Sequence, residues 1–371
     1  MIRVGIVGAT GVVGQQFVVA LQNHPWFRIA WLAASERSAN QSYGEALRDR
    51  KTGAVRWFCA EEPSADILAM PVETTSSFDP DRVDLLFTAI ESEQARELEP
   101  VFARTTPVIS TASAFRYEPD VPLVIPGINS HHLALLRYQQ RRRGWRGFIA
   151  PNPNCTTVGL AISLRPLHER FGVTSVVMTS LQALSGAGRS PGVIGLDILD
   201  NVIPFIPGEE EKVQRETQKI LGTLEDDGIR PAPFAVSCTC TRVNVSEGHT
   251  EAVFVGLSRP ASLDEVRDAL ESFTGDFADR DLPSAPRRMI LVRDDPYRPQ
   301  PRLDRTVDDG MTTVIGRLRV DDVLPNGIKY VLVSHNTKMG AAKGCVLTAE
   351  VMVRDGYLGT PVPVAPSRAP A

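Results

Sequence analysis

Cys155 is the residue of this sequence best placed for nucleophilic chemistry. It stands in Pro151-Asn-Pro-Asn-Cys155-Thr-Thr157, where the prolines interrupt regular structure, and the sequence behind it predicts a helix over residues 158–171. A helix N-terminus stabilises a thiolate through the helix dipole, so the pattern predicts a nucleophile. A buried, unreactive cysteine is the alternative that this motif alone leaves open.

His249 is the second candidate for chemistry. It follows a glycine turn at Gly248, after a predicted strand over residues 234–245. A single histidine is more often structural, so its meaning depends on a partner. Because 94 positions separate it from Cys155 (249 − 155), the fold must bring the two side chains together.

A glycine-rich turn near the start predicts a dinucleotide site. The β-branched run 2–7 leads into a G-x-x-G-x-x-G motif and then a helix-like segment, residues 15–22. Glycines at these positions let the backbone approach a pyrophosphate that sits on the free N–H groups of the helix N-terminus. The residues expected to bind the cofactor here are Gly8, Thr10, Gly11, Val12, Val13 and Gly14.

The choice between NAD and NADP depends on the end of the second predicted strand, residues 28–35. Glu36 lies 22 residues past Gly14 (36 − 14), where an acidic side chain would hold a ribose hydroxyl. Ser35, Arg37 and Ser38 surround it with donors suited to a 2′-phosphate. The sequence therefore favours NADP, with NAD as the alternative.

The elements that must position these residues fall into two groups. Apolar strands at 28–35, 83–88 and 107–110 alternate with helix-compatible segments, which predicts a Rossmann-type parallel α/β sheet. From about residue 173, longer strands at 174–184, 234–245 and 251–257 with few helices predict an α+β domain with a mainly antiparallel sheet. Helices are expected over 262–273 and 341–353.

Composition narrows the class of protein. The 371 residues carry a formal net charge of −4, which leaves no positive excess for nucleic acid, and no apolar run is long enough to cross a membrane. The start of the chain lacks signal-peptide order, so we expect a cytoplasmic protein. The five scattered cysteines fit no disulfide framework.

Together, these motifs resemble the aspartate-β-semialdehyde dehydrogenases, archaeal and fungal-like branch, from about residue 2 to 355. Five motifs occur in family order: GATGVVG, Ser113-Ala-Phe-Arg116, PNPNCTT, Gln182 in SLQALSGAG, and Gly208-Glu-Glu-Glu-Lys212 followed by RVNVSEGH. The resemblance implies NADP-dependent reductive dephosphorylation of L-aspartyl-4-phosphate to the semialdehyde (EC 1.2.1.11), a step in lysine, threonine and methionine synthesis.

The resemblance also implies a role for each motif residue. Cys155 attacks the acyl phosphate and forms a thioester, while His249 takes the thiol proton and later protonates the alkoxide. Arg242 binds the substrate α-carboxylate and Glu209 its ammonium, and Lys212 and Arg116 bind the phosphate beside Ser113. Gln182 positions the substrate, and Asn154 is an amide donor to the oxyanion. Gly186 and Gly188 leave room for the nicotinamide, and Asn336 returns to the cofactor.

The implied organisation has an NADP-binding domain at 1–152, rejoined by residues 336–356, and a catalytic and dimerisation domain at 153–335. Residues 357–371 are expected to form a disordered tail, because Pro and Ala repeat there. A homodimer or homotetramer is expected, and the partners are otherwise the acyl phosphate or aldehyde substrate and inorganic phosphate.

Some positions depart from the family pattern. Asn244 stands where proline is more common, and Lys338-Met339 replaces a more typical Val-Arg pair. We expect the thiols of Cys238-Thr-Cys240 to face opposite sides of a strand, and no metal site is predicted because no His/Cys pair with ligand spacing accompanies them.

Two other functions stay open at this point. A malonyl-coenzyme A reductase would keep Cys155, His249 and the glycine turn and change only the roles of Glu209 and Lys212. A catalytically inactive NADP-binding regulator would keep the glycine turn alone.

Overall fold

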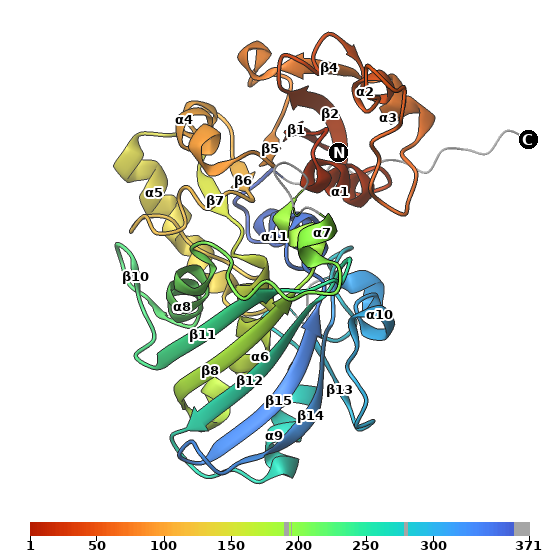
Figure 1. Cartoon of the computed structure of the whole chain (residues 1–371). Coiled ribbons are helices and arrows are strands. Elements are labelled where there is room, and N and C mark those ends of the chain that lie inside the picture. Colours follow the sequence, from red (N-terminus) through yellow and green to blue (C-terminus); the bar gives the residue numbers. More distant parts are fainter. Residues whose placement is uncertain (189–192, 194, 278–280, 360–371) are drawn as a thin grey trace, which may run out of the picture.

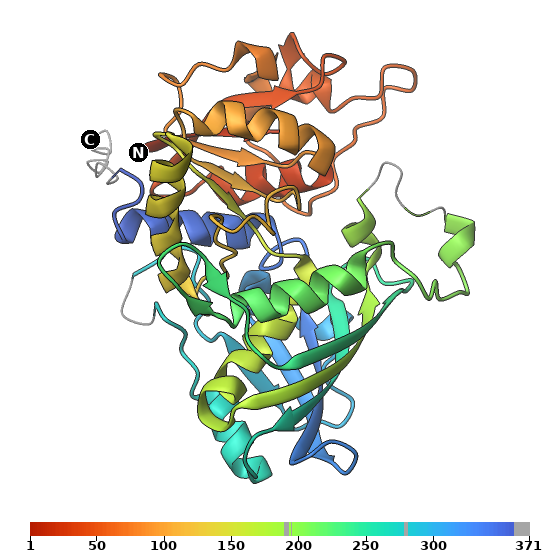
Figure 2. The same ribbon diagram turned by 90° about the vertical axis from the view of Figure 1, so that its left-hand side faces the viewer.

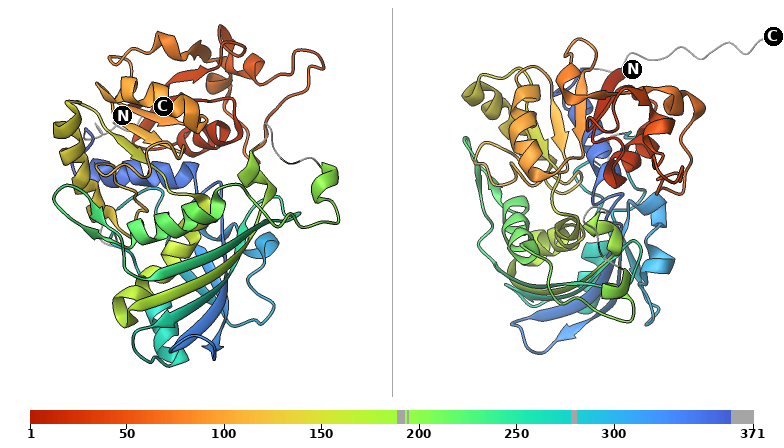
Figure 3. Two further views of the ribbon diagram at one scale, coloured as in Figure 1. Left: turned by 60° about the vertical axis from the view of Figure 1, so that its left-hand side comes forward. Right: turned by 45° about the horizontal axis from the view of Figure 1, so that its top comes forward.

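Two β-sheets stacked one above the other form the framework of the protein (Figure 1). The computed structural model describes residues 1–188, 193, 195–277 and 281–359. Helices cover both faces of the first sheet and one side of the second (Figures 2 and 3). The described part of the chain has no helix long and apolar enough to cross a membrane.

The first sheet has seven strands in the order β3-β4-β2-β1-β5-β6-β7, all parallel except the pair β3 and β4. Its central strands are buried and rich in Val, Ile and Leu, as expected for a parallel sheet covered on both faces. The strands are β1 (Ile2–Val7), β2 (Phe27–Ala34), β3 (Gln41–Ser42), β4 (Pro71–Thr74), β5 (Leu85–Thr88), β6 (Val108–Ser110) and β7 (Ile149–Pro151). The main helices of this part are α1 (Val12–Leu21), α4 (Ser92–Ala103) and α5 (Leu135–Arg143).

The second sheet has six strands in the order β11-β8-β12-β15-β14-β13. Its three central pairings are antiparallel, whereas β11 with β8 and β13 with β14 are parallel. The strands are β8 (Val173–Gln182), β11 (Ala235–Arg242), β12 (His249–Leu257), β13 (Ile290–Arg293), β14 (Thr313–Asp321) and β15 (Gly327–Ser334). The mainly antiparallel α+β arrangement predicted from the sequence is confirmed.

Side chains alternate along β8 between the two faces of the second sheet. One face packs on α6 (Cys155–Phe171), whose long run of buried residues forms the core of this part. The other face leaves large apolar side chains in solvent: Val177 is 44% exposed and Leu181 38% exposed. This face therefore leaves large apolar side chains in contact with solvent, which is unusual for a sheet with apolar residues on both sides; it is called the open face below.

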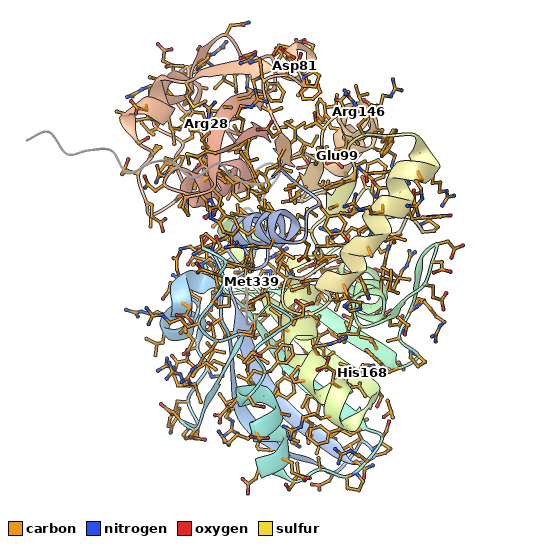
Figure 4. All side chains as sticks on the ribbon, turned by 180° about the vertical axis from the view of Figure 1, so that it is seen from behind. Arg28, Asp81, Glu99, Arg146, His168 and Met339 are labelled. Carbon is orange, nitrogen blue, oxygen red and sulfur yellow. The ribbon has the colours of Figure 1, made fainter. Side chains whose placement is uncertain are left out.

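The last helix, α11 (Ala342–Arg354), lies between the two sheets and packs on α1 (Figure 1). Its Glu350 accepts hydrogen bonds from the His24 ring, over 2.8 Å, and from the Ser284 N–H. Met339, just before this helix, lies at the junction of the two layers, whereas His168 lies far down α6 (Figure 4). The segment that contains α11 thus returns to the first sheet.

Two expectations from the sequence are wrong. Cys238 and Cys240 both lie on the buried face of β11, because residues i and i+2 of a strand share a face. The expected disordered tail begins too early: Leu358 is buried and the Tyr357 N–H donates to the Met352 carbonyl. Residues 360–371 lie outside the described residues.

Candidate active site

A cleft of about 760 Å³ runs between the two sheets and contains the nucleophile candidate. One end is formed by the glycine turn before α1 and the other by the start of α6. The residues named from the sequence that line it are Gly11, Val12, Val13, Ser113, Arg116, Asn154, Cys155, Gly186, Gly188, Glu209, Lys212, Arg242 and Asn336.

Cys155 is the first residue of α6 and Asn154 is its N-cap. The Asn154 Oδ1 atom accepts hydrogen bonds from the Thr156 and Thr157 N–H groups at 2.9 and 3.2 Å. Pro153 ends the preceding segment, so the helix begins sharply at the cysteine. The helix N-terminus predicted for Cys155 is present, and the helix starts three residues earlier than the sequence suggested.

The Cys155 Sγ atom lies 3.2 Å from Nε2 of His249. On the other side of the ring, the Ala183 N–H donates to Nδ1 over 3.1 Å. A backbone N–H can only donate, so Nδ1 carries no proton and the neutral ring is protonated at Nε2. His249 therefore presents a donor to the sulfur, and taking the thiol proton at Nε2 would require loss of the Ala183 hydrogen bond.

Burial keeps both members of this pair neutral in the absence of substrate. It raises the pKa of the Cys155 thiol to about 12, and the nearby Glu209 acts in the same direction, whereas Arg242 and Arg116 oppose it. Burial, with the positive charge of Arg242, lowers the pKa of His249 to about 3. The electrostatics do not favour a thiolate–imidazolium pair before substrate arrives.

Three strand ends bring the predicted catalytic residues to one edge of the second sheet. Gln182 ends β8 and lies opposite Arg242, which ends the parallel strand β11. His249 begins β12, which runs antiparallel on the other side of β8. The expected turn at Gly248, with φ +91°, leads into β12. Strand β8 pairs with both β11 and β12, so Arg242 and His249 lie on either side of its end, at the same end of the sheet.

The Arg242 and Gln182 side chains differ in orientation at this edge. Arg242 lines the cleft and its Nη1 atom donates to the Ala183 carbonyl over 2.8 Å. Gln182 does not line the cleft: its Nε2 atom donates to Ser180 Oγ over 3.2 Å. The substrate-positioning role of Gln182 stays a prediction.

Gly186 lies directly against the catalytic side chains. A Cβ there would be 3.0 Å from Arg242 Nη1 and 3.1 Å from His249 Cε1. Gly188 has φ +64°, lines the cleft, and has no atom of the described residues within 4 Å of a Cβ position. Asn336 accepts from the Gly248 N–H and donates to Ser185 Oγ, so it joins the C-terminal segment to both loops.

Helix α8 (Glu209–Ile220) carries the charged residues of the opposite wall. Glu209 is buried, and its Oε1 atom accepts from Asn154 Nδ2 over 2.9 Å. Lys212 lies 3.8 Å from Glu209 Oε2. The Asn154 amide predicted as an oxyanion donor is thus bonded to Glu209, whereas the Cys155 N–H has no partner among the described residues.

Arg116 reaches the cleft from the first sheet, from the segment after β6. Its Nη2 atom donates to the Thr111 carbonyl and its Nη1 atom to Glu216, both over 3.0 Å. Its Nε atom is buried and unpaired within the described ranges. A buried, unpaired guanidinium N–H in a cleft suits an anionic ligand such as phosphate. Ser113, nearby, bonds to the Ser92 hydroxyl over 2.8 Å.

Glu216 is a site residue that the sequence reasoning missed. It is buried and bonds both to Arg116 and to the Asn154 N–H. Glu216 follows Glu209 by seven positions and so lies on the same face of α8, but this spacing alone does not mark it as a site residue.

The glycine turn has the shape that a dinucleotide requires. Gly8 has φ +82°, and a Cβ there would be 2.2 Å from the Ala89 carbonyl oxygen. A Cβ on Gly14 would be 2.2 Å from the Gly8 carbonyl oxygen, so the helix can only pack closely with glycine there. Gly8, Thr10 and Gly14 shape the turn without lining the cleft, while Gly11 exposes the N-terminus of α1 to it. These residues fit a bound pyrophosphate.

Ser35, Arg37 and Ser38 follow β2 and lie outside the cleft lining. Ser35 and Arg37 are exposed, and Ser38 is buried in the turn. The Arg50 guanidinium, which the sequence reasoning missed, donates to the Arg37 backbone carbonyl over 2.6 Å, so a second positive charge lies close to the Arg37 main chain. Glu36 is exposed next to them.

Two family models and a curated relative match most of this chain. Residues 3–136 match a model described as semialdehyde dehydrogenase, NAD binding domain, and residues 164–339 match semialdehyde dehydrogenase, dimerisation domain. The chain is 46% identical over 352 residues to an aspartate-semialdehyde dehydrogenase of Methanothermobacter thermautotrophicus, covering 95% of this chain and 99% of that one.

Solved structures agree. Aspartate semialdehyde dehydrogenase with NADP from Candida albicans has a TM-score of 0.86 at 35% identity, covering 96% of this chain and 100% of that chain. Aspartate semialdehyde dehydrogenase II complexed with ASA from Vibrio cholerae has a TM-score of 0.75 at 28% identity, over 96% of this chain and 99% of that one. With its motifs gathered in one cleft and its likeness spanning both parts of the chain, this protein belongs to the aspartate-semialdehyde dehydrogenase family.

Proposed function

We propose that this protein is an NADP-dependent aspartate-semialdehyde dehydrogenase (EC 1.2.1.11), which reversibly converts L-aspartyl-4-phosphate to L-aspartate-4-semialdehyde and phosphate. The observation that carries the proposal is the 3.2 Å contact between Cys155 Sγ and His249 Nε2 at the start of α6, in the cleft that also contains the glycine turn. A nucleophile and a dinucleotide turn on one cleft suit a thioester route to an aldehyde.

Charged groups around the sulfur match the two ends of the substrate. Arg242 binds the α-carboxylate through its planar fork, and Glu209 binds the ammonium. Arg116 and Lys212 bind the phosphate, and the unpaired Nε of Arg116 supports this role. When Glu209 turns to the ammonium, Asn154 Nδ2 is released and can donate to the substrate oxygen.

The Cys155 sulfur attacks the acyl carbon while the thiol proton passes to a phosphate oxygen of the substrate, and the C–O bond to phosphate breaks with its electron pair passing to the phosphate. Besides Asn154 Nδ2, the His249 Nε2–H and the Cys155 N–H donate to the oxygen that becomes negative in this step. NADPH, when bound, supplies the hydride that reduces the thioester. The carbonyl then re-forms and the sulfur leaves as thiolate, so His249 acts as a donor throughout and need not lose its proton.

NADP is the proposed cofactor because Arg37 follows β2 beside Ser35 and Ser38, and the Arg50 guanidinium donates to the Arg37 backbone carbonyl. The proposed assembly is a homodimer through the open face of the second sheet. Val177 and Leu181 lie exposed on that face, within the residues that match the dimerisation-domain model. Burying such side chains between two subunits removes apolar surface from water.

An assay of the purified protein with aspartate semialdehyde, NADP and inorganic phosphate tests the proposal. NADP reduction that requires phosphate is the expected result. NADP reduction that instead requires malonate semialdehyde and coenzyme A would identify a malonyl-coenzyme A reductase or a related thioester reductase. NADP binding without turnover would point to a regulator, and either outcome overturns the proposal.

Cys155→Ser checks the covalent route in the same assay. We expect kcat to fall by several orders of magnitude, because serine is a far weaker nucleophile, while NADP still binds. Turnover near the wild-type rate would rule out the thioester.

A further inference from the structure

We propose that Glu216 is a positioning residue that holds the phosphate-binding Arg116 and the start of the nucleophile helix in one fixed arrangement. The inference rests on the proposed function, since it assigns Arg116 to phosphate. It adds a residue of α8 that touches neither substrate nor sulfur but sets where both are held.

The Glu216 carboxylate bonds to three groups from two other parts of the chain. Its Oε1 atom accepts from Arg116 Nη1 over 3.0 Å and from the Tyr117 hydroxyl over 3.3 Å. Its Oε2 atom accepts from the Asn154 N–H over 2.6 Å. The side chain is fully buried and Arg116 is only 6% exposed, so these bonds are shielded from water.

The three partners come from two segments that are far apart in the sequence. Arg116 and Tyr117 follow β6 of the first sheet, whereas the Asn154 N–H immediately precedes Cys155. With Nη1 on Glu216 and Nη2 on the Thr111 carbonyl, the guanidinium is fixed on two sides and keeps Nε free. A donor that is already oriented loses little entropy when phosphate binds.

Only a carboxylate with the length of Glu satisfies this arrangement. Oε1 and Oε2 must both accept, one from a guanidinium and the other from a backbone N–H. A glutamine has one acceptor oxygen and one NH2 group, so it leaves Arg116 or the Asn154 N–H facing another donor. An aspartate keeps the charge but is one methylene too short to reach both partners.

The test is steady-state kinetics of Glu216→Gln in the direction of aldehyde oxidation. We expect the KM for inorganic phosphate to rise about tenfold and kcat to fall severalfold, because Arg116 and the Cys155 backbone lose the same anchor. The KM values for NADP and for the aldehyde should stay within about twofold of wild type. A phosphate KM within about twofold of wild type, or an equal rise in all three KM values, would overturn the proposal.

Two control variants separate positioning from general damage. Glu210→Gln alters a carboxylate on the same helix, whose Oε1 atom accepts from the Cys240 N–H outside the cleft, and should leave phosphate binding unchanged. Tyr117→Phe removes one of the three bonds to Glu216 and leaves the other two, so its phosphate KM should also stay near wild type. If Glu210→Gln reproduces the Glu216→Gln change, the effect is not specific to the anchor and the proposal fails.

A second readout covers the case in which Glu216→Gln fails to fold. Phosphate should raise the thermal unfolding temperature of the wild type, and Glu216→Asp should lose most of that increase. An increase as large as in the wild type would overturn the proposal. A wild type that turns over without phosphate would refute the proposed function instead, so the two failures are distinguishable.

Discussion

The backbone N–H of Ala183 donates to Nδ1 of His249 and so determines which nitrogen of the ring carries the proton. Ala183 follows Gln182 at the end of β8, and His249 begins the neighbouring strand β12. The main chain of one strand therefore fixes the tautomer of a side chain on the next. His249 faces Cys155 with an N–H that can stabilise negative charge on sulfur or oxygen.

Replacing His249 distinguishes a donor from a base. We expect His249→Ala to lower kcat about 100- to 1000-fold, the usual loss when one oxyanion donor is removed. His249→Gln, whose amide N–H extends about as far as Nε2, should recover at least about tenfold of that loss in kcat. Equal kcat values for the two variants would show that His249 must accept a proton.

Arg242→Lys tests the binding of the α-carboxylate. Lysine keeps the charge but loses the planar fork and its bond to the Ala183 carbonyl, so we expect the KM for aspartate semialdehyde to rise about tenfold or more. An analogue without the α-carboxylate is the control, and the wild type should use it about as poorly as the variant uses the natural substrate. An unchanged KM for aspartate semialdehyde would show that Arg242 does not bind the substrate α-carboxylate.

Arg37→Ala tests the choice of cofactor. Loss of a charge-assisted bond to the 2′-phosphate should raise the KM for NADP about thirtyfold, which corresponds to about 2 kcal/mol, and leave the KM for NAD nearly unchanged. Arg48→Ala is the matched control, because Arg48 is exposed nearby and bonds to the Gly53 carbonyl. Equal use of NAD and NADP by the wild type would show that Glu36 binds the ribose hydroxyl and that Arg37 does not select the 2′-phosphate.

Glu99 predicts a pH-dependent change in stability. This buried side chain of α4 (Figure 4) accepts from the Thr88 and Ser110 hydroxyls, and burial raises its pKa to about 7. Because the folded protein binds the Glu99 proton more tightly than the unfolded chain, this group adds to the free energy of unfolding at low pH. The contribution is fully present below pH 4.5, the ordinary pKa of a glutamate, and is lost as the pH rises to about 7.

Glu99→Gln removes that titration and keeps the acceptor oxygen. Relative to wild type, we expect its free energy of unfolding to increase between pH 5 and pH 8 by up to roughly 3 kcal/mol, measured by urea denaturation at each pH. A difference between the two proteins that does not change over this range would show that Glu99 titrates normally.

Features encoded in short segments could be predicted from the sequence. The glycine turn, the helix start at Cys155 and the strand before His249 each depend on a few adjacent residues, and the two kinds of sheet follow from the spacing of apolar runs. Features that depend on packing between distant segments could not. Glu216 matters because α8 lies against both the segment after β6 and the turn before α6, and no local pattern reports such contacts.

The orientation of side chains at the strand ends of the second sheet could not be predicted from the sequence either. Gln182 has the position expected from its motif, but its side chain bonds to Ser180 instead of entering the cleft. The proton position on His249 depends on Ala183, a residue without functional groups of its own, through a backbone bond that no motif records.

The return of α11 to α1 has a consequence for synthesis of the protein on the ribosome. The first sheet and its early helices are complete once about 150 residues have been made, yet the helix that covers one side of α1 is encoded by residues 342–354. Until those residues emerge, α1 presents apolar side chains to solvent, and His24 lacks its Glu350 partner. The cofactor domain therefore matures only after residues 342–354 have been made, and a chain that stops before residue 342 should remain prone to aggregation and degradation.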